Sequence, residues 1–171
     1  DGFFVSNFVG KTSFAAVNFI FPVSMGVAAL GFMLGTGGSA VVAKTIGEGK
    51  KELANQYFSM VIYVGIALSM IFSVICVLFM PRIARMLGAE GTLLQDCIIY
   101  GRVLFVAETA FILQNMFQSF FVAAEKPGLS LKINIAAGLT NVVFDYVFIA
   151  AFRWGVAGAA LATGMGQVVG G

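Results

Sequence analysis

The chain has 171 residues, of which 60% are apolar and 11% are charged, with a formal net charge of +2 and a mean hydropathy of +0.97. Soluble domains contain about 45–50% apolar and about 25% charged residues, so the composition excludes a water-soluble enzyme or nucleic-acid-binding protein, and it also excludes a disordered chain. We therefore expect a polytopic membrane protein.

Charge-free apolar stretches divide the chain into predicted membrane helices, because about 20 apolar residues cross the hydrocarbon core. Such blocks disfavour a β-barrel, whose strands alternate with a period of two, so the predicted fold class is an all-α transmembrane helix bundle. The predicted spans are the tail of an earlier helix at 1–8, complete helices at 12–43, 53–80, 103–124 and 133–152, and a truncated helix at 155–171. With no initiator Met and an apolar end, the chain is expected to be part of a longer protein.

The connections between the predicted spans are short and polar. Pro81 and Arg82 are expected to end the second span, and the linker up to Arg102 has the spacing of a helix that lies on the membrane surface. Lysine and arginine counts on the two sides are equal and do not orient the bundle. The denser basic clusters in 44–52 and 125–132 favour the cytoplasm for that side.

The most informative polar residue is Asp145, since a carboxylate in mid-membrane costs about 2.5–3.5 kcal/mol on insertion scales. Asn141 lies one helical turn before it, and Asn134 lies seven residues earlier still on the same stripe. This arrangement predicts a site for Na⁺ or a proton. The alternative is a structural pair that hydrogen-bonds neighbouring helices.

Glu108 is the second acidic residue inside a complete span, and Asn115 shares its stripe. This face could line a water-filled cavity. It could equally form hydrogen bonds between helices, or Glu108 could pair with Arg102.

Other residue types suggest packing rather than chemistry. Gly31 and Gly35, like Gly166 and Gly170, have the small-residue spacing that lets membrane helices approach closely. The chain contains no histidine, and its two cysteines show no metal-ligand spacing. We find no set of nucleophile, base and metal ligands that an enzyme would need, and we expect no cofactor.

Several segments, taken in order, resemble one family. The opening DGFFVSNFVGKTSFAAVNFIFP, the stretch GTGGSAVVAKTIGEGKKELAN, and the segments NVVFD at 141–145 and WGVAGAALAT at 154–163 are similar to the first, second, fifth and sixth helices of MATE (multidrug and toxic compound extrusion) transporters. The resemblance covers essentially the whole chain.

This resemblance implies a twelve-helix antiporter in the cell membrane, of which the chain is most of the N-terminal lobe. It further implies a cytoplasmic position for the loops 44–52 and 125–132. The family's cation-binding cluster would fall on Asp1, Asn141, Asp145 and Thr163. The implied partners are the lipid bilayer, a drug-like small molecule and a C-terminal lobe of the same protein.

The function expected from these observations is export of amphiphilic, often cationic, small molecules in exchange for H⁺ or Na⁺. Two alternatives stay open. One is a flippase of the same superfamily for lipid-linked precursors or polysaccharides, for which a more cationic cavity would be expected. The other is a membrane scaffold without transport, in which replacement of Asp145 by Leu would be neutral or stabilising.

Overall fold

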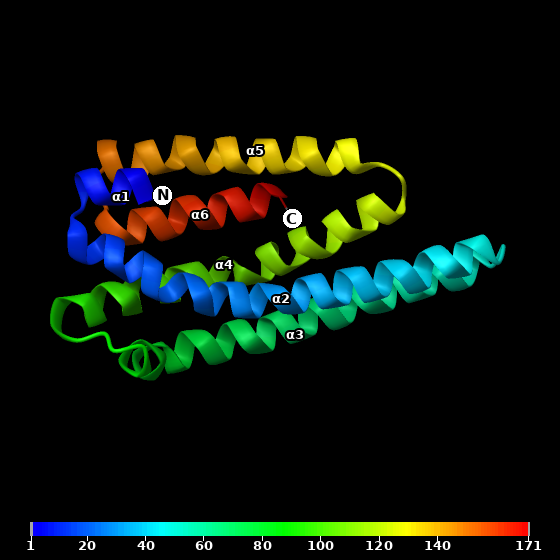
Figure 1. Cartoon of the computed structure of the whole chain (residues 1–171), viewed down its shortest axis with the longest axis horizontal. Coiled ribbons are helices and arrows are strands. Elements are labelled where there is room, and N and C mark those ends of the chain that lie inside the picture. The colour runs from blue at the N-terminus through cyan, green and yellow to red at the C-terminus, as the bar shows by residue number, and fades with distance from the viewer. Residues whose placement is uncertain (1, 171) are drawn as a thin grey trace.

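The structure, a computed structural model, describes residues 2–170, and in that range it contains helices and no strand (Figure 1). The predicted all-α class is therefore confirmed. The helices are α1 (Gly2–Phe8), α2 (Lys11–Gly47), α3 (Lys51–Met86), α4 (Gly91–Ala123), α5 (Pro127–Asp145), the π-helical segment η1 (Tyr146–Ala151) and α6 (Gly155–Gly170).

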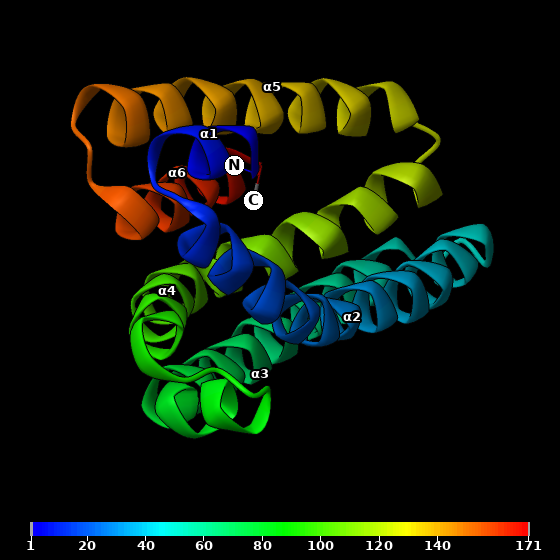
Figure 2. The same cartoon turned by 60° about the vertical axis from the view of Figure 1, so that its left-hand side comes forward.

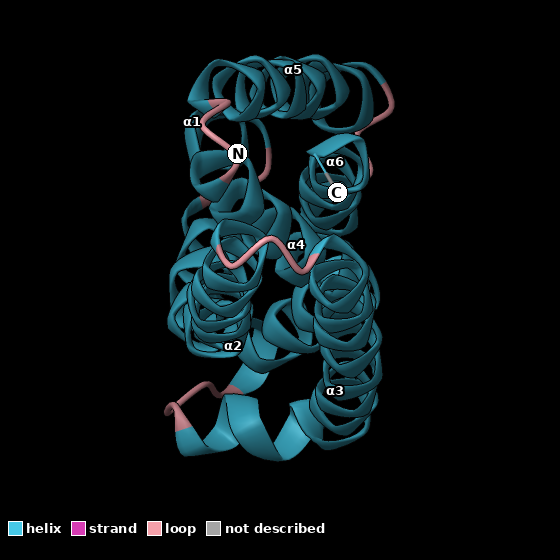
Figure 3. Cartoon of the chain, turned by 90° about the vertical axis from the view of Figure 1, so that its right-hand side faces the viewer, coloured by secondary structure: helices cyan, strands magenta, loops and turns pink. Residues whose placement is uncertain are grey.

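Helix α4 lies in the middle of the bundle. It packs on α2 and α3 on one side and on α6 on the other, and α5 covers the far face of α6 (Figure 2). A view along the long axis shows the same order, with α5 at one end and α2 and α3 at the other (Figure 3). Residues of the cavity described below therefore come from helices that are far apart in the sequence.

Three segments are long and apolar enough to cross a membrane: α2, α3, and the continuous run Gly128–Ala151 formed by α5 and η1. The predicted spans 103–124 and 155–171 fall on α4 and α6. Helix α6 has 16 residues, and polar residues such as Glu108 and Gln114 lower the hydropathy of α4. The helices extend beyond the predicted spans, because hydropathy marks only the part that can lie in the hydrocarbon core.

The second predicted span ends at Pro81, but the helix does not end there. Helix α3 continues through Pro81 to Met86, and α4 already begins at Gly91. There is accordingly no separate surface helix between them, and Arg82 belongs to the last turns of α3, with its guanidinium 5.4 Å from the centre of the Phe79 ring. A proline removes one backbone hydrogen bond from a helix but does not by itself end it when the flanking turns are well formed.

The outer face of α3 is apolar and exposed. Large side chains such as Met70, Ile71, Val74 and Leu78 are 54–67% accessible. A row of this kind is unfavourable in water and favourable against lipid chains. The bundle therefore presents a lipid-facing surface, as a multi-pass membrane protein must.

Small residues allow the close helix contacts in the interior. A β-carbon on Gly35 of α2 would lie 2.9 Å from the Met116 Cα of α4. On α6, a β-carbon on Gly166 would lie 2.9 Å from the Ala137 oxygen of α5. The packing function predicted from the glycine spacing is confirmed at both helices.

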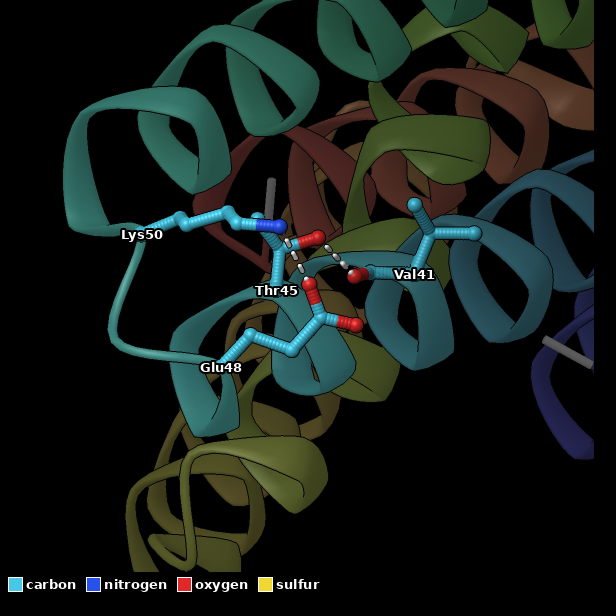
Figure 4. A network of polar contacts seen from close by, with 4 residues as sticks. All are labelled: Val41, Thr45, Glu48 and Lys50. Atoms are coloured by element: carbon cyan, nitrogen blue, oxygen red, sulfur yellow. Dashed lines mark hydrogen bonds and ion pairs between the residues drawn. The ribbon is translucent and has the colours of Figure 1, made fainter.

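The turn between α2 and α3 closes through local polar contacts (Figure 4). The Thr45 hydroxyl donates to the Val41 carbonyl oxygen at 2.8 Å, and Lys50 Nζ lies 2.9 Å from Glu48 Oε2. Gly49 between the two charged residues has φ +80°, a conformation that glycine adopts without strain. Because both charged side chains are exposed, the ion pair contributes little to stability.

Candidate functional site

A cavity of about 560 Å³ lies between α2, α4, α5 and α6. Its wall combines aromatic and aliphatic side chains with amides and hydroxyls. The lining residues are Phe14, Val17, Asn18, Phe21, Ser24 and Met25 of α2, Tyr100, Leu104, Phe111 and Gln114 of α4, Asn134, Ala137, Gly138 and Asn141 of α5, and Thr163, Gly166 and Gln167 of α6. This is the composition of a pocket for a small amphiphilic molecule.

Close packing of α6 against both neighbours brings its polar residues to this cavity. A β-carbon on Gly164 would lie 2.9 Å from the Ala107 Cβ of α4, and one on Gly166 would lie 3.0 Å from the Asn141 Cβ of α5. Larger residues at these positions would move α6 away from α4 or α5. The hydroxyl of Thr163 and the amide of Gln167 therefore lie on the cavity wall because their neighbours on α6 are small.

The structure brings three of the four predicted cation-site residues to one region. Asn141 and Thr163 both line the cavity. Asp145 lies one turn beyond Asn141 and has no accessible surface, so it sits behind the cavity wall. Thr163 Oγ1 also donates to the Ala159 carbonyl oxygen at 3.0 Å. Asp1 lies outside the described residues.

Tyr100 is a member of this region that sequence reasoning missed. Its side chain is 2% exposed, and its phenol is close enough to the Thr163 side chain, Asp145 and Glu108 to interact with all three. The helical spacing could have indicated this, because Tyr100 and Glu108 are about two helical turns apart on one side of the same helix. It was overlooked because residue 100 was assigned to a linker rather than to α4.

The backbone changes its winding immediately after Asp145. Helix α5 ends at Asp145, and the next six residues, Tyr146–Ala151, form a π-helix. π-Helical segments are rare, and this one forms the C-terminal end of the α5 run, before the turn to α6. The sequence predicted one uninterrupted helix over 133–152, so this change of winding is a finding of the structure.

Glu108 and Asn115, predicted to line a cavity, lie behind its wall. Glu108 is 0% exposed and accepts hydrogen bonds from Ser24 Oγ at 3.2 and 3.1 Å. Asn115 is 3% exposed, and its amide nitrogen donates to the Phe111 carbonyl oxygen. Of the alternatives for Glu108, a hydrogen bond between helices is therefore the one observed, and its partner is Ser24 of α2 rather than Arg102.

An amide cluster borders the cavity, which two of its members, Gln114 and Asn134, line. Gln114 Nε2 and Gln118 Nε2 of α4 both donate to Asn134 Oδ1 of α5, at 3.1 and 2.6 Å. Gln167 of α6 is 8% exposed, and its side-chain oxygen has no hydrogen-bond partner within the described part of the chain. This oxygen is buried, so a bound molecule with an N–H or O–H group could reach it only after the Gln167 side chain rotates toward the cavity.

The donor set suits a hard monovalent cation or a proton better than a transition metal. Among residues 2–170, no group of three or more acidic or cysteine side chains lies close enough together to hold a metal ion. Asp145, Asn141 and Thr163 supply a carboxylate, an amide oxygen and a hydroxyl, and oxygen atoms of these kinds are the ligands that hard cations prefer.

Comparison with known proteins gives consistent matches along the chain. The MatE family model matches residues 1–147. A multidrug export protein, MepA of Staphylococcus aureus strain MRSA252, is 29% identical over 154 residues, which is 90% of this chain and 34% of that protein. The chain thus spans about a third of the length of this curated relative.

Solved structures agree with this match. A crystal structure of MATE in the bent conformation superposes with a TM-score of 0.93 at 30% identity, over 99% of this chain and 38% of that one. An inward-facing conformation of a multidrug resistance MATE family transporter of the MOP superfamily gives a TM-score of 0.92 at 29% identity, again over 99% and 38% of the two chains.

Proposed function

The chain belongs to the MatE family, and on that premise we propose that it is part of a secondary antiporter that exports amphiphilic, often cationic, small molecules in exchange for H⁺ or Na⁺. The multidrug export name of its relative supports the export of drug-like molecules. The remainder of such a transporter, including a second lobe, would complete the path across the membrane.

One observation carries this proposal: Asn141 and Thr163 line a cavity large enough for a small molecule, and the buried carboxylate of Asp145 lies one helical turn beyond Asn141 on α5. A cation bound at Asp145 would remove a charge that is costly at this depth. It would also change the electrostatic surroundings of Tyr100, which lines the same cavity. The cavity and the cation site would therefore share residues.

Because the cavity and the cation site share residues, binding of the cation could drive alternating access. Binding of the coupling cation at Asp145 from outside would weaken the affinity of the cavity for substrate, and release of the cation to the inside would restore it. Coupling requires that the cation bind the two conformations with different affinity, since equal affinity shifts no equilibrium.

The wall of the cavity favours export of neutral or cationic molecules over a lipid-linked precursor. Within residues 2–170, no lysine or arginine is among the residues that line it. A phosphate-bearing headgroup would therefore find amides and hydroxyls on this lobe but no cationic side chain.

The experiment that tests the proposal replaces Asp145 by Asn in the full-length transporter. We expect drug accumulation in cells to rise to the level of cells without the transporter, with unchanged amounts of protein in the membrane. Glu125→Gln is the control, because it neutralises an exposed carboxylate in the turn between α4 and α5. Transport at the wild-type rate by Asp145→Asn would contradict the proposal. Measuring accumulation with and without a Na⁺ gradient separates Na⁺ from H⁺.

A further inference from the structure

Glu108 is the other fully buried acidic side chain in the described part of the chain, and the cation site proposed above does not use it. It lies on α4 at 0% exposure, where α2, α3 and α6 pack around that helix. Within residues 2–170, the hydroxyl of Ser24 is its one side-chain hydrogen-bond partner, and no lysine or arginine forms an ion pair with it.

The surroundings of Glu108 offer little to balance a negative charge. From α3, the buried thiol of Cys76 interacts with it electrostatically. From its own helix, the phenol of Tyr100 does so as well, and this phenol also interacts with Asp145 at the end of α5. The contact of α6 nearby is between Gly164 and Ala107, which carry no titratable group. A single neutral hydroxyl does not compensate a buried carboxylate, so the site favours the protonated acid.

Ser24 connects this carboxyl group to the cavity. Its side chain is among those that line the cavity wall, and its Oγ atom lies 3.2 and 3.1 Å from Glu108 Oε1 and Oε2. The cavity volume of about 560 Å³ is many times that of a water molecule, which occupies about 30 Å³ in the liquid. A hydroxyl between water and an acid is the arrangement that passes a proton, because it can donate and accept at once.

We propose that Glu108 is a second proton-binding group of this lobe, which exchanges its proton with water in the cavity through the hydroxyl of Ser24. In uptake, Ser24 Oγ accepts a proton from a hydronium ion in the cavity while its own proton moves to a carboxylate oxygen of Glu108. One O–H bond forms at each acceptor and one breaks at each donor, and the carboxylate becomes a neutral acid. Release follows the same steps in reverse.

The proposal that Glu108 binds a proton holds whether H⁺ or Na⁺ is the ion at Asp145. Its use in transport rests on the function proposed above, since only an alternating cavity would expose Ser24 to the two sides of the membrane in turn. In that case the number of protons moved per substrate would include a contribution from Glu108.

The test is infrared spectroscopy of the purified full-length protein, which detects a protonated carboxyl group by its C=O stretching band. We expect the difference spectrum between wild type and Glu108→Gln at neutral pH to contain a carboxyl band, and the same band to appear when both proteins also carry Asp145→Asn. The difference between wild type and Glu90→Gln should lack it. Glu90 is the matched control because it is exposed and makes no capping hydrogen bond. Ser24→Ala should shift the band, because the carboxyl group loses its hydrogen-bond partner.

The second measurement is proton release after a jump to alkaline pH. Glu108→Gln should release one proton fewer per molecule than the wild type. Ser24→Ala should release the same number several-fold more slowly, and this milder variant also tests the relay if Glu108→Gln fails to fold. A difference spectrum between wild type and Glu108→Gln that contains no carboxyl band, or a band there that never titrates, would overturn the proposal, as would an unchanged release rate in Ser24→Ala. Loss of the antiport hypothesis through Asp145→Asn would leave these readouts untouched.

Discussion

Gly31 on α2 lies directly against the backbone carbonyl of Ile112 on α4. A β-carbon at residue 31 would stand 2.8 Å from that oxygen and 3.2 Å from the Ile112 Cα. Backbone atoms of a helix cannot rotate aside as a side chain can, so this contact sets the distance between two helices. The same pair of helices brings Ser24 within hydrogen-bond distance of Glu108.

Replacement of Gly31 by alanine should therefore destabilise the protein. Overpacking at a helix contact costs about 1–3 kcal/mol, while alanine gains up to about 1 kcal/mol over glycine in helix propensity. The matched control is Gly26→Ala on the same helix, where a β-carbon would meet nothing within 4 Å. Thermal unfolding of the purified full-length protein should show a lower Tm for Gly31→Ala and an equal or higher Tm for Gly26→Ala. Equal shifts for the two variants would mean that the contact does not limit the approach of the helices.

The sequence predicted that Gly31 lies where two helices approach closely, though not which helix is the partner, because close helix packing in membranes depends on small residues at a spacing of four. It also predicted the bundle and the membrane location, which follow from composition and from the length of the apolar stretches. These properties depend on local composition. They can therefore be read without knowing which helices are neighbours.

Features that depend on contacts between distant helices were not predictable in the same way. The partner of Glu108 is Ser24, which lies 84 residues away in the sequence, whereas local reasoning offered Arg102. The π-helical winding after Asp145 has no known signature in the residues of that segment. The ends of the helices also differ from the ends of the predicted spans, as at Pro81, because a fall in hydropathy marks the edge of the hydrocarbon core and not the end of a helix.

Ser13 and Asp96 join the first turns of α2 and α4 at the end of the bundle remote from the α2–α3 turn. Ser13 Oγ donates to Asp96 Oδ2 at 2.7 Å, and the serine is 7% exposed. Hydrogen bonds to charged acceptors contribute about 1.5–3 kcal/mol when buried, and the partial exposure of Asp96 lowers this. A double-mutant cycle with Ser13→Ala and Asp96→Ala should give a coupling energy of about 1–2 kcal/mol. Additive effects of the two substitutions would show that the pair contributes nothing to stability.

The side-chain oxygen of Asn134 accepts hydrogen bonds from two glutamine side chains, so replacing Asn134 should lower the free energy of unfolding. In Asn134→Leu, the amide groups of Gln114 and Gln118 lose the oxygen to which both donate. We expect a loss of about 1–3 kcal/mol in the free energy of unfolding, because partly buried donors are left without an acceptor. The control is Thr140→Val on the same helix, whose hydroxyl donates to the Ala136 oxygen of its own helix. It should change stability by less than about 0.5 kcal/mol. A leucine variant as stable as this control would mean that water replaces Asn134 for both glutamines.

Replacement of Gln167 by leucine should raise the free energy of unfolding and weaken the binding of substrate. Gln167 is among the residues that line the cavity and is 8% exposed, and its side-chain oxygen is buried and has no partner among the described residues. Gln167→Leu removes this unsatisfied acceptor, so the free energy of unfolding should rise by about 1 kcal/mol. Substrates that donate a hydrogen bond from an ammonium group should bind about 10-fold more weakly, which corresponds to about 1.4 kcal/mol. Gln95→Leu, at an exposed position near the start of α4, is the control for a change from amide to leucine. Calorimetric unfolding and equilibrium binding of a cationic dye measure the two effects, and tighter binding by Gln167→Leu would show that the amide does not contact the bound molecule.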